Sequence, residues 1–349
     1  MKALMYRGVS PEGRGDFQLI DVPVPDCPPG SVELDVEWCG ICGSDLHEFE
    51  ADTMSTYATP VVIGHEFSGV VSRVGEGVDS VRVGQRVAVE PFLHCRECAA
   101  CLAGDSHLCP SLAVVGAHHA GGGFAQKAVV PAYTLHALPD SIAPEVGALI
   151  EPLAVGWHAL RKAHFTAGQS VLIIGAGPIG LASLLCAQAQ DASLTLVSVR
   201  RPGARERAAR ELGADAVLDA SSDDVLARVM ELTDGRGVDV VLECSGATEG
   251  MELSMKALAN GGVIVSLSVW LEPAPCDYLQ LLLKEATIVG SKGYNGQDFP
   301  EVIEAVASGR IVAPERIITT RLALDDVITD GFMELERDRT AHVKVLVRP

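Results

Sequence analysis

Four cysteines follow one another closely in the sequence, at Cys95, Cys98, Cys101 and Cys109. Thiolates at this spacing are typical ligands of tetrahedral structural zinc, and the metal closes a loop that has no core of its own. Unligated or disulfide-bonded thiols are the alternative, but clustered cysteines in a cytosolic chain more often bind metal. The spacing therefore predicts a structural zinc with no open ligand position.

A second set of metal-ligand residue types is scattered along the first part of the chain. It comprises Cys42, the adjacent His65 and Glu66, and the distant Glu151. A thiolate, an imidazole and a carboxylate can all bind zinc, and a catalytic zinc keeps three protein ligands and one open position. Spacing alone does not join these segments, so a core cysteine and a hydrogen-bonded core histidine remain the alternative.

A glycine-rich turn directly follows the apolar run at residues 171–174 and precedes an apolar helical stretch. Such a turn lets the backbone approach a pyrophosphate, whose charge then meets the free N–H groups of the helix N-terminus. The strand–turn–helix context favours a dinucleotide site over a turn without a ligand. The residues predicted to bind the cofactor here are Gly175, Gly177, Pro178, Ile179 and Gly180.

The next apolar run ends at Val199 and leads into Arg200, Arg201 and Arg205. Enzymes that use NAD place an acidic residue near this point to hold the ribose hydroxyls, but the first carboxylate here is Glu206. Guanidinium groups bind phosphate through a planar fork of donors. We therefore predict that Val199 and the three arginines bind the cofactor and that NADP is favoured over NAD. A solvated arginine turn in an NAD enzyme is the alternative.

The secondary structure expected for the segments that position these residues changes along the chain. Residues 1–150 contain short alternating runs broken by Gly and Pro, as β-rich domains do, whereas apolar strands alternate with helical stretches from about residue 170. This alternation predicts an α/β fold with a doubly wound parallel sheet of the Rossmann type. We expect a catalytic domain at 1–154, a dinucleotide-binding domain at 155–291, and a segment at 292–349 that returns to the catalytic domain.

The composition excludes several classes of partner. The 349 residues carry a formal net charge of −19, which argues against nucleic acid because phosphate binding needs a basic surface. We find no apolar run of about 18 residues and no apolar signal region after Met1, so we expect no membrane partner and a cytoplasmic protein.

Taken together, these motifs resemble those of the zinc-containing medium-chain alcohol dehydrogenases over nearly the whole chain. The resemblance rests on the run at 64–69, the four-cysteine loop, the glycine turn and the run at 151–158. The runs at 39–49 and 342–347 are most similar to those of the butanediol and polyol dehydrogenase branch. The resemblance implies a GroES-like catalytic domain and hydride transfer between a small secondary alcohol or vicinal diol, or the matching ketone, and NAD(P).

The resemblance also implies roles at the second set of residues. Cys42 and His65 would be ligands of a catalytic zinc, whereas Cys39, in the same motif, would not. Glu66 and Glu151 would share the third ligand position. Asp45 matches an acid that orients the ligand histidine.

Proton transfer would begin at Ser44. Its hydroxyl would accept the proton of the alcohol that zinc activates, and His47 would pass this proton to solvent through the cofactor ribose. A turn serine that bonds its own backbone is the alternative for Ser44. The side chains that we consider for lining the substrate pocket, with ordinary packing as the alternative, are Phe49, Tyr57, Phe92, His118 and His119.

One departure from the family bears on the substrate. Sorbitol dehydrogenases carry an Arg-Tyr pair where this chain has Gly293-Tyr294, which favours a short diol. A polyol dehydrogenase is the alternative with the same chemistry, and a catalytically silent nucleotide-binding scaffold is the alternative of a different class. The apolar runs at 263–270 and 286–290 predict a sheet edge, and the resemblance implies that this edge pairs subunits into a homodimer or homotetramer.

Overall fold

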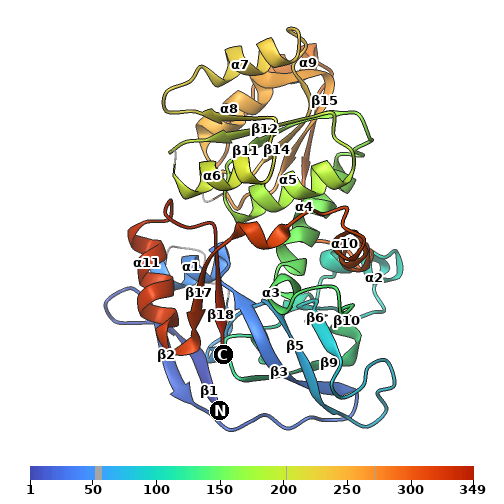
Figure 1. Cartoon of the computed structure of the whole chain (residues 1–349), viewed down its shortest axis with the longest axis vertical. Helices are drawn as coiled ribbons and strands as arrows, with labels where there is room; N and C mark the ends of the chain where they lie inside the picture. Colours follow the sequence, from blue (N-terminus) through green and yellow to red (C-terminus); the bar gives the residue numbers. More distant parts are fainter. Residues whose placement is uncertain (52–56, 202, 271) are drawn as a thin grey trace. The chain divides into compact units, whose positions relative to one another are not determined.

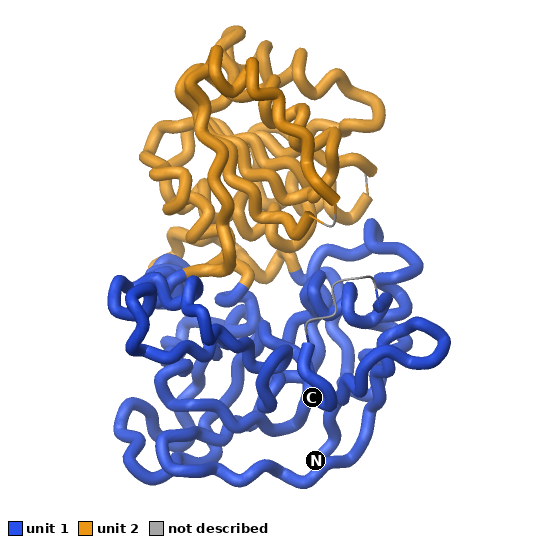
Figure 2. Tube along the Cα trace, turned by 180° about the vertical axis from the view of Figure 1, so that it is seen from behind, with its two compact units in different colours: residues 1–151, 295–307, 318–349 blue, residues 152–294, 308–317 orange. Residues whose placement is uncertain are grey.

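The structure is a computed structural model that describes residues 1–51, 57–201, 203–270 and 272–349. The chain forms two compact units, coloured separately in Figure 2. Unit 1 comprises residues 1–151, 295–307 and 318–349, and unit 2 comprises residues 152–294 and 308–317. Residues 308–317 thus pack with unit 2, whereas the sequence led us to place all of 292–349 with the catalytic domain.

Unit 2 is built on a six-stranded sheet with the order β13-β12-β11-β14-β15-β16, in which every adjacent pair is parallel. This is the doubly wound order, and it confirms the predicted Rossmann fold. The central strand is buried at every position, because helices cover both faces of such a sheet. The strands are β11 Ser170–Ile174, β12 Leu194–Val199, β13 Ala216–Asp219, β14 Val238–Glu243, β15 Leu258–Ser266 and β16 Thr287–Gly290.

The helices of unit 2 connect these strands, as Figure 1 shows. Helices α5 and α6 pack together beside β11–β13, and α7 packs with α8. Helix starts follow ordinary capping chemistry: Pro178 occupies the first turn of α5, and the Asp224 side chain accepts from Ala227 N at the start of α7. The helices are α5 Pro178–Ala189, α6 Ala204–Glu211, α7 Val225–Leu232, α8 Thr248–Ala257 and α9 Tyr278–Leu283.

Unit 1 is β-rich, as predicted. A seven-stranded sheet has the order β10-β6-β5-β3-β18-β17, with β9 also paired to β3, and a three-stranded sheet has the order β2-β1-β4. The strands of unit 1 are β1 Lys2–Val9, β2 Gly15–Asp21, β3 Ser31–Gly40, β4 Val61–Val62, β5 Glu66–Val74, β6 Arg86–Val89, β7 Phe92–Leu93, β8 Ala113–Val114, β9 Lys127–Pro131, β10 Leu135–Ala137, β17 Ile318–Ala323 and β18 Lys344–Arg348.

Short helices join the strands of unit 1 and cover their apolar core. This core includes a cluster of aromatic rings around Phe332. The helices are α1 Gly43–Glu50, α2 Ala99–Leu102, α3 Pro144–Gly147, α10 Asp298–Ala307 and α11 Met333–Arg337, and α4 Ile150–Lys162 contains the boundary between the two units. Within the described ranges, no helix is both long and apolar enough to cross a membrane.

Candidate active site

The end of strand β3 is the point on which the second set of residues converges. Gly40 pairs with Glu66 at the start of β5 and with Leu346 of β18 on the other side. Cys42 follows immediately and precedes α1. Three segments that are far apart in sequence therefore meet at one sheet position, which spacing alone could not predict.

The ligand atoms of Cys42, His65 and Glu66 all lie within 4.8 Å of one another. His65 and Glu66 are buried, with 8% and 1% of their surface exposed. Asp45, fully buried on α1, holds the backbone N–H of Cys42 through Oδ2 at 3.0 Å, and its Oδ1 lies 3.6 Å from His65 Nδ1. The structure thus brings together three of the four predicted ligands and places Asp45 beside the histidine.

Negative charge surrounds the His65 ring. Burial by itself lowers the pKa of His65, but the negative charges of Asp45 and Cys42 and a hydrogen bond to Cys42 outweigh it and raise the pKa well above the usual value. A half-buried cysteine, a buried imidazole and a buried carboxylate form a donor set that suits zinc with an open fourth position. The residues present therefore fit a catalytic zinc ion.

Lys344, on β18, is a residue that the sequence analysis missed. It is 1% exposed, forms an ion pair with Glu66 and donates to the Ile41 carbonyl over 2.9 Å. Burial acts to lower the pKa of Lys344, but the charges of Glu66 and Cys42 outweigh it and raise the pKa, so the ammonium stays charged. A Cβ at Gly40 would clash with the Glu66 carboxylate and the end of Lys344, so a larger residue here would displace the ion pair.

Glu151 lies in the first turn of α4 and is 8% exposed. Its charge contributes to the raised pKa of both His65 and Lys344, which places it in the electrostatic surroundings of the cluster. The carboxylate that lies among the three clustered donors is that of Glu66. A ligand role for Glu151 stays a prediction.

The predicted proton relay lies on α1, which carries both Ser44 and His47. The Tyr57 hydroxyl is 3.1 Å from Ser44 Oγ and 2.9 Å from Asp45 Oδ1. The structure therefore gives Tyr57 polar contacts that we did not predict for a side chain lining the pocket. His118 and His119 are exposed, and the His118 ring lies 6.3 Å from the Tyr57 ring.

The two phenylalanines that we considered for the substrate pocket are both buried. Phe49 packs edge-on against Phe17 and tilted against Phe332, each with ring centroids 5.3 Å away, so it is a core residue. Phe92 begins the two-stranded β7–β8 sheet and is 8% exposed. For Phe49, ordinary packing accounts for the side chain.

The four cysteines of the loop gather around one point. Sγ–Sγ distances are 3.5 Å for Cys98–Cys101, 3.6 Å for Cys95–Cys109 and 3.8 Å for Cys95–Cys101. Backbone N–H groups of Glu97 and Cys98 point at Cys95 and lower its pKa to about 6, which favours the thiolate that zinc requires. The geometry fits a closed tetrahedral zinc site, and no disulfide occupies the loop.

Replacing Cys98 with serine should remove the zinc of this loop alone. Because α2 has four residues and none of them is buried, this helix has little burial of its own to keep it in place. We expect zinc per chain to fall from two to one and proteolysis to begin within residues 95–109, measured by elemental analysis and limited proteolysis. Cys276→Ser, outside the cluster, is the control and should keep both ions; two ions in Cys98→Ser would contradict the assignment.

The glycine turn joins β11 to α5. Gly175 has φ of +100°, which favours glycine, and a Cβ at Gly180 would collide with the Gly175 carbonyl. Pro178 and Ile179 open the helix, whose N-cap is Gly177. The turn thus has the tight backbone that a pyrophosphate needs.

A cavity of about 230 Å³ lies beside this turn, at the carboxyl ends of β11, β12 and β14. Arg200 lines it, Arg201 is exposed, and the preceding Val199 is buried. Arg205 lies in the first turn of α6 and is half-buried. The lining residues are Ile174, Gly175, Ser198, Arg200, Ala220, Ser245, Ala247, Glu249, Gly250 and Leu253.

Glu243, at the end of β14, shapes this cavity and was also missed. The carboxylate is fully buried and accepts from Ser245 N at 2.8 Å and from Gly246 N at 3.2 Å. These bonds fix the loop that contributes Ser245 and Ala247 to the cavity. The only feature of the sequence that could have indicated this role of Glu243 is an acidic residue at the end of an apolar run.

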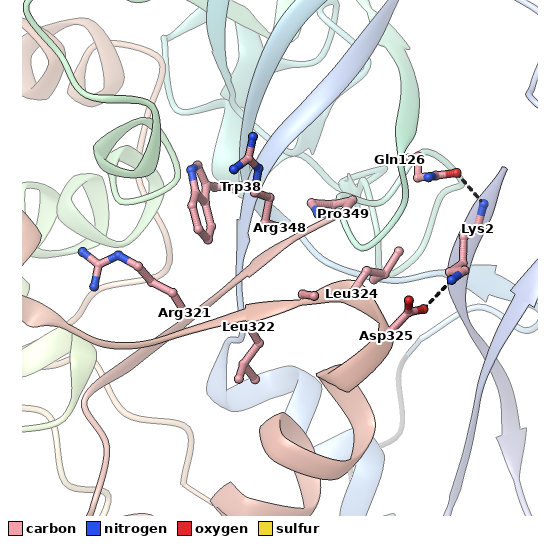
Figure 3. Close-up of a pocket in the computed structure, with 10 residues that line it drawn as sticks. Lys2, Trp38, Gln126, Arg321, Leu322, Leu324, Asp325, Arg348 and Pro349 are labelled. Atoms are coloured by element: carbon pink, nitrogen blue, oxygen red, sulfur yellow. Dashed lines mark hydrogen bonds and ion pairs between the residues drawn. The ribbon is translucent and has the colours of Figure 1, made fainter.

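A further hollow of about 380 Å³ lies on unit 1 between Trp38, Arg321, Leu322 and Arg348 (Figure 3). Lys2 and Asp325 pair at one side of it, and Lys2 N also donates to Gln126. None of the described residues that line it belongs to either predicted zinc site. It is a surface hollow separate from the chemistry above.

Two family models match parts of the chain. Residues 28–140 match the alcohol dehydrogenase GroES-like domain, and residues 178–308 match the zinc-binding dehydrogenase domain. An (R,R)-butanediol dehydrogenase of Neisseria gonorrhoeae is 37% identical over 96% of this chain and 97% of its own. A sorbitol dehydrogenase of Halalkalibacterium halodurans is 32% identical over 100% of this chain and 99% of its own.

Solved structures extend the comparison. The crystal structure of 2R,3R-butanediol dehydrogenase from Bacillus subtilis superposes with a TM-score of 0.90, at 34% identity over 100% of this chain and 99% of that one. A zinc-binding dehydrogenase from Sinorhizobium meliloti bound to NADP has a TM-score of 0.89 at 32% identity, and an alcohol dehydrogenase from E. coli CFT073 complexed with NADH has 0.90 at 30%. Each covers 100% of this chain and 99% of its own. Similar chains thus carry either nicotinamide cofactor.

Proposed function

The chain belongs to the zinc-binding, medium-chain alcohol dehydrogenase family, and from this membership we propose that it oxidises a short vicinal diol of the butanediol type to the hydroxyketone, and reverses that reaction. The observation that carries the proposal is the cluster of Cys42 with the buried His65 and Glu66. A catalytically silent scaffold would have no need to keep these three ligand types together in a negatively charged interior.

Each residue of the site would have a separate role in the reaction. Cys42, His65 and one of Glu66 and Glu151 would hold zinc, which as a Lewis acid makes the alcohol hydroxyl more acidic. Asp45 would orient the His65 ring through Nδ1 and keep its other nitrogen available. Ser44 would accept the hydroxyl proton, and His47 would pass it to solvent, because an imidazole exchanges protons near neutral pH.

The dinucleotide would lie along the glycine turn of unit 2. The free N–H groups at the start of α5 would face its pyrophosphate, and the cavity lined by Ser198, Arg200 and Ser245 would take the adenosine end. The cofactor supplies the hydride chemistry, while the protein supplies binding and orientation.

The decisive experiment compares kcat/KM for the stereoisomers of butane-2,3-diol on zinc-replete protein, with NAD⁺ and with NADP⁺. Turnover of one isomer supports the short-diol assignment. Rates that rise with the number of substrate hydroxyls would favour the polyol alternative, for which the sorbitol dehydrogenase relative is the supporting observation. No turnover of any secondary alcohol, with a single zinc per chain, would favour the scaffold.

For the cofactor, we propose a preference for NADP that depends on Arg200, which lines the adenosine cavity. Arg200→Ala should lower kcat/KM for NADP⁺ roughly 10- to 100-fold, because a charge-assisted hydrogen bond contributes about 1.5–3 kcal/mol. The value for NAD⁺ should change little. Arg207→Ala, at an exposed arginine on the following helix α6, is the control; equal losses with both cofactors would contradict a 2′-phosphate role.

We also propose that unit 2 carries the subunit interface of a cytoplasmic homodimer or homotetramer. Strand β16 is the terminal strand of its sheet, with Ile288 37% exposed, and the neighbouring α9 exposes Leu279 and Leu282 at 62% and 72%. Ile288→Lys should dissociate the assembly to the 36.7 kDa chain in sedimentation velocity, because a charge disfavours pairing at this edge. An unchanged mass would place the interface elsewhere.

A further inference from the structure

The hydroxyl of Tyr57 touches two parts of the proposed machinery at once. It donates to Asp45 Oδ1 over 2.9 Å and lies 3.1 Å from Ser44 Oγ. Ser44 and Asp45 are neighbours on the first turn of α1, and Asp45 Oδ1 lies 3.6 Å from His65 Nδ1. Tyr57 therefore connects the residue that would take the alcohol proton with the acid that would orient a zinc ligand.

The ring of Tyr57 is held in place from several directions. It packs edge-on against Tyr6 with ring centroids 6.3 Å apart and lies 6.3 Å from the His118 ring. Its backbone N–H donates to Glu48 Oε1 over 3.4 Å. The hydroxyl thus has a fixed position from which to contact Ser44 and Asp45.

A phenol is a suitable partner for a serine that changes role. Ser44 would present a lone pair to an alcohol during oxidation and a hydrogen toward the substrate oxygen during ketone reduction. A hydroxyl neighbour can accept or donate a hydrogen bond, so it can satisfy Ser44 in both directions. Burial and the charge of Asp45 raise the pKa of Tyr57 well above its usual value, so the hydroxyl keeps its proton at neutral pH.

We propose that Tyr57 is a positioning residue for the reaction: its hydroxyl orients the Ser44 hydroxyl and anchors it to Asp45. The proposal rests on the proposed function, because Ser44 has a proton to accept only if an alcohol is oxidised here. It differs from a pocket-lining role, since a phenylalanine would line the pocket equally well. Tyr57→Phe, which removes only the hydroxyl, therefore separates the two interpretations.

The kinetic test uses Tyr57→Phe, Ser44→Ala and the double variant, assayed in both directions. We expect Tyr57→Phe to lower kcat roughly 10-fold, with KM within about twofold, because proton transfer by a positioned group contributes about 10²–10⁴-fold and the group itself remains. The solvent deuterium isotope effect should rise. The double variant should be no slower than Ser44→Ala, because residues acting as one unit are non-additive. Wild-type rates in Tyr57→Phe, or losses that multiply in the double variant, would overturn the proposal.

A second readout does not depend on turnover. In cobalt-substituted protein, Tyr57→Phe should shift the visible absorption of the metal, since Asp45 loses a donor and its contact with His65 changes. Tyr6→Phe makes the same chemical change one ring away and is the matched control for packing. A shifted spectrum in a protein that oxidises no alcohol would contradict the proposed function, but it would still support the contact of Tyr57 with Asp45. Normal rates with an unshifted spectrum would contradict the Tyr57 proposal and leave the proposed function in place.

Discussion

Replacing Cys42 with alanine should remove the catalytic zinc and lower kcat/KM by about 10³-fold or more. Cys42 is one of three clustered donors, and without its thiolate the site retains an imidazole and a carboxylate already paired with Lys344. Lewis-acid activation is worth several kcal/mol, and each 1.36 kcal/mol is about tenfold in rate. Elemental analysis should report one zinc per chain, held by the four-cysteine loop.

Cys39 provides the matched control for this experiment. It lies in the same motif, is fully buried and belongs to the apolar core of unit 1. Cys39→Ala should keep both zinc ions and near-normal rates, with at most a modest loss of stability from the small cavity. Loss of zinc from Cys39→Ala, with zinc retained in Cys42→Ala, would reverse the assignment of the ligand thiol.

The parts of the site that the sequence could predict are those whose residues are close together in the chain. The loop from Cys95 to Cys109 and the turn from Gly175 to Gly180 each contain their own chemistry, so spacing alone indicated a function. The alternation of apolar runs and helical stretches likewise predicted the parallel sheet of unit 2. It gave no separate prediction for the short strand β13 or the helix α7, whose apolar runs are brief.

Strand register explains what could not be predicted. Lys344 lies in an alternating run that is typical of a half-exposed strand, and only its pairing in β18 beside β3 buries it against Glu66. Tyr57 was considered for lining the substrate pocket, but nothing in the sequence indicated that its hydroxyl contacts Ser44 and Asp45. Contacts of this kind join residues that have no fixed spacing in the sequence, so neither composition nor motifs could predict them.

The buried ion pair yields the largest expected effect on stability. Lys344→Met should lower the free energy of unfolding by about 3–5 kcal/mol, because Glu66 would be left as an uncompensated buried charge. Urea denaturation with excess zinc measures this loss. Glu66→Gln should also destabilise the protein, since it leaves the Lys344 ammonium unpaired beside Gly40.

A double variant distinguishes the contribution of the Glu66–Lys344 ion pair to stability from that of the metal. Glu66→Gln with Lys344→Met removes both charges, so it should recover stability relative to Lys344→Met alone, whereas independent sites would give additive losses. Lys127→Met makes the same substitution at a half-exposed pair with Glu33 and Asp35, and should cost about 1 kcal/mol or less. If Lys344→Met were no less stable than Lys127→Met, the charge of Glu66 would have to be balanced by the metal rather than by lysine. Glu66 would then be the carboxylate that binds zinc, and Lys344 would not be needed to balance its charge.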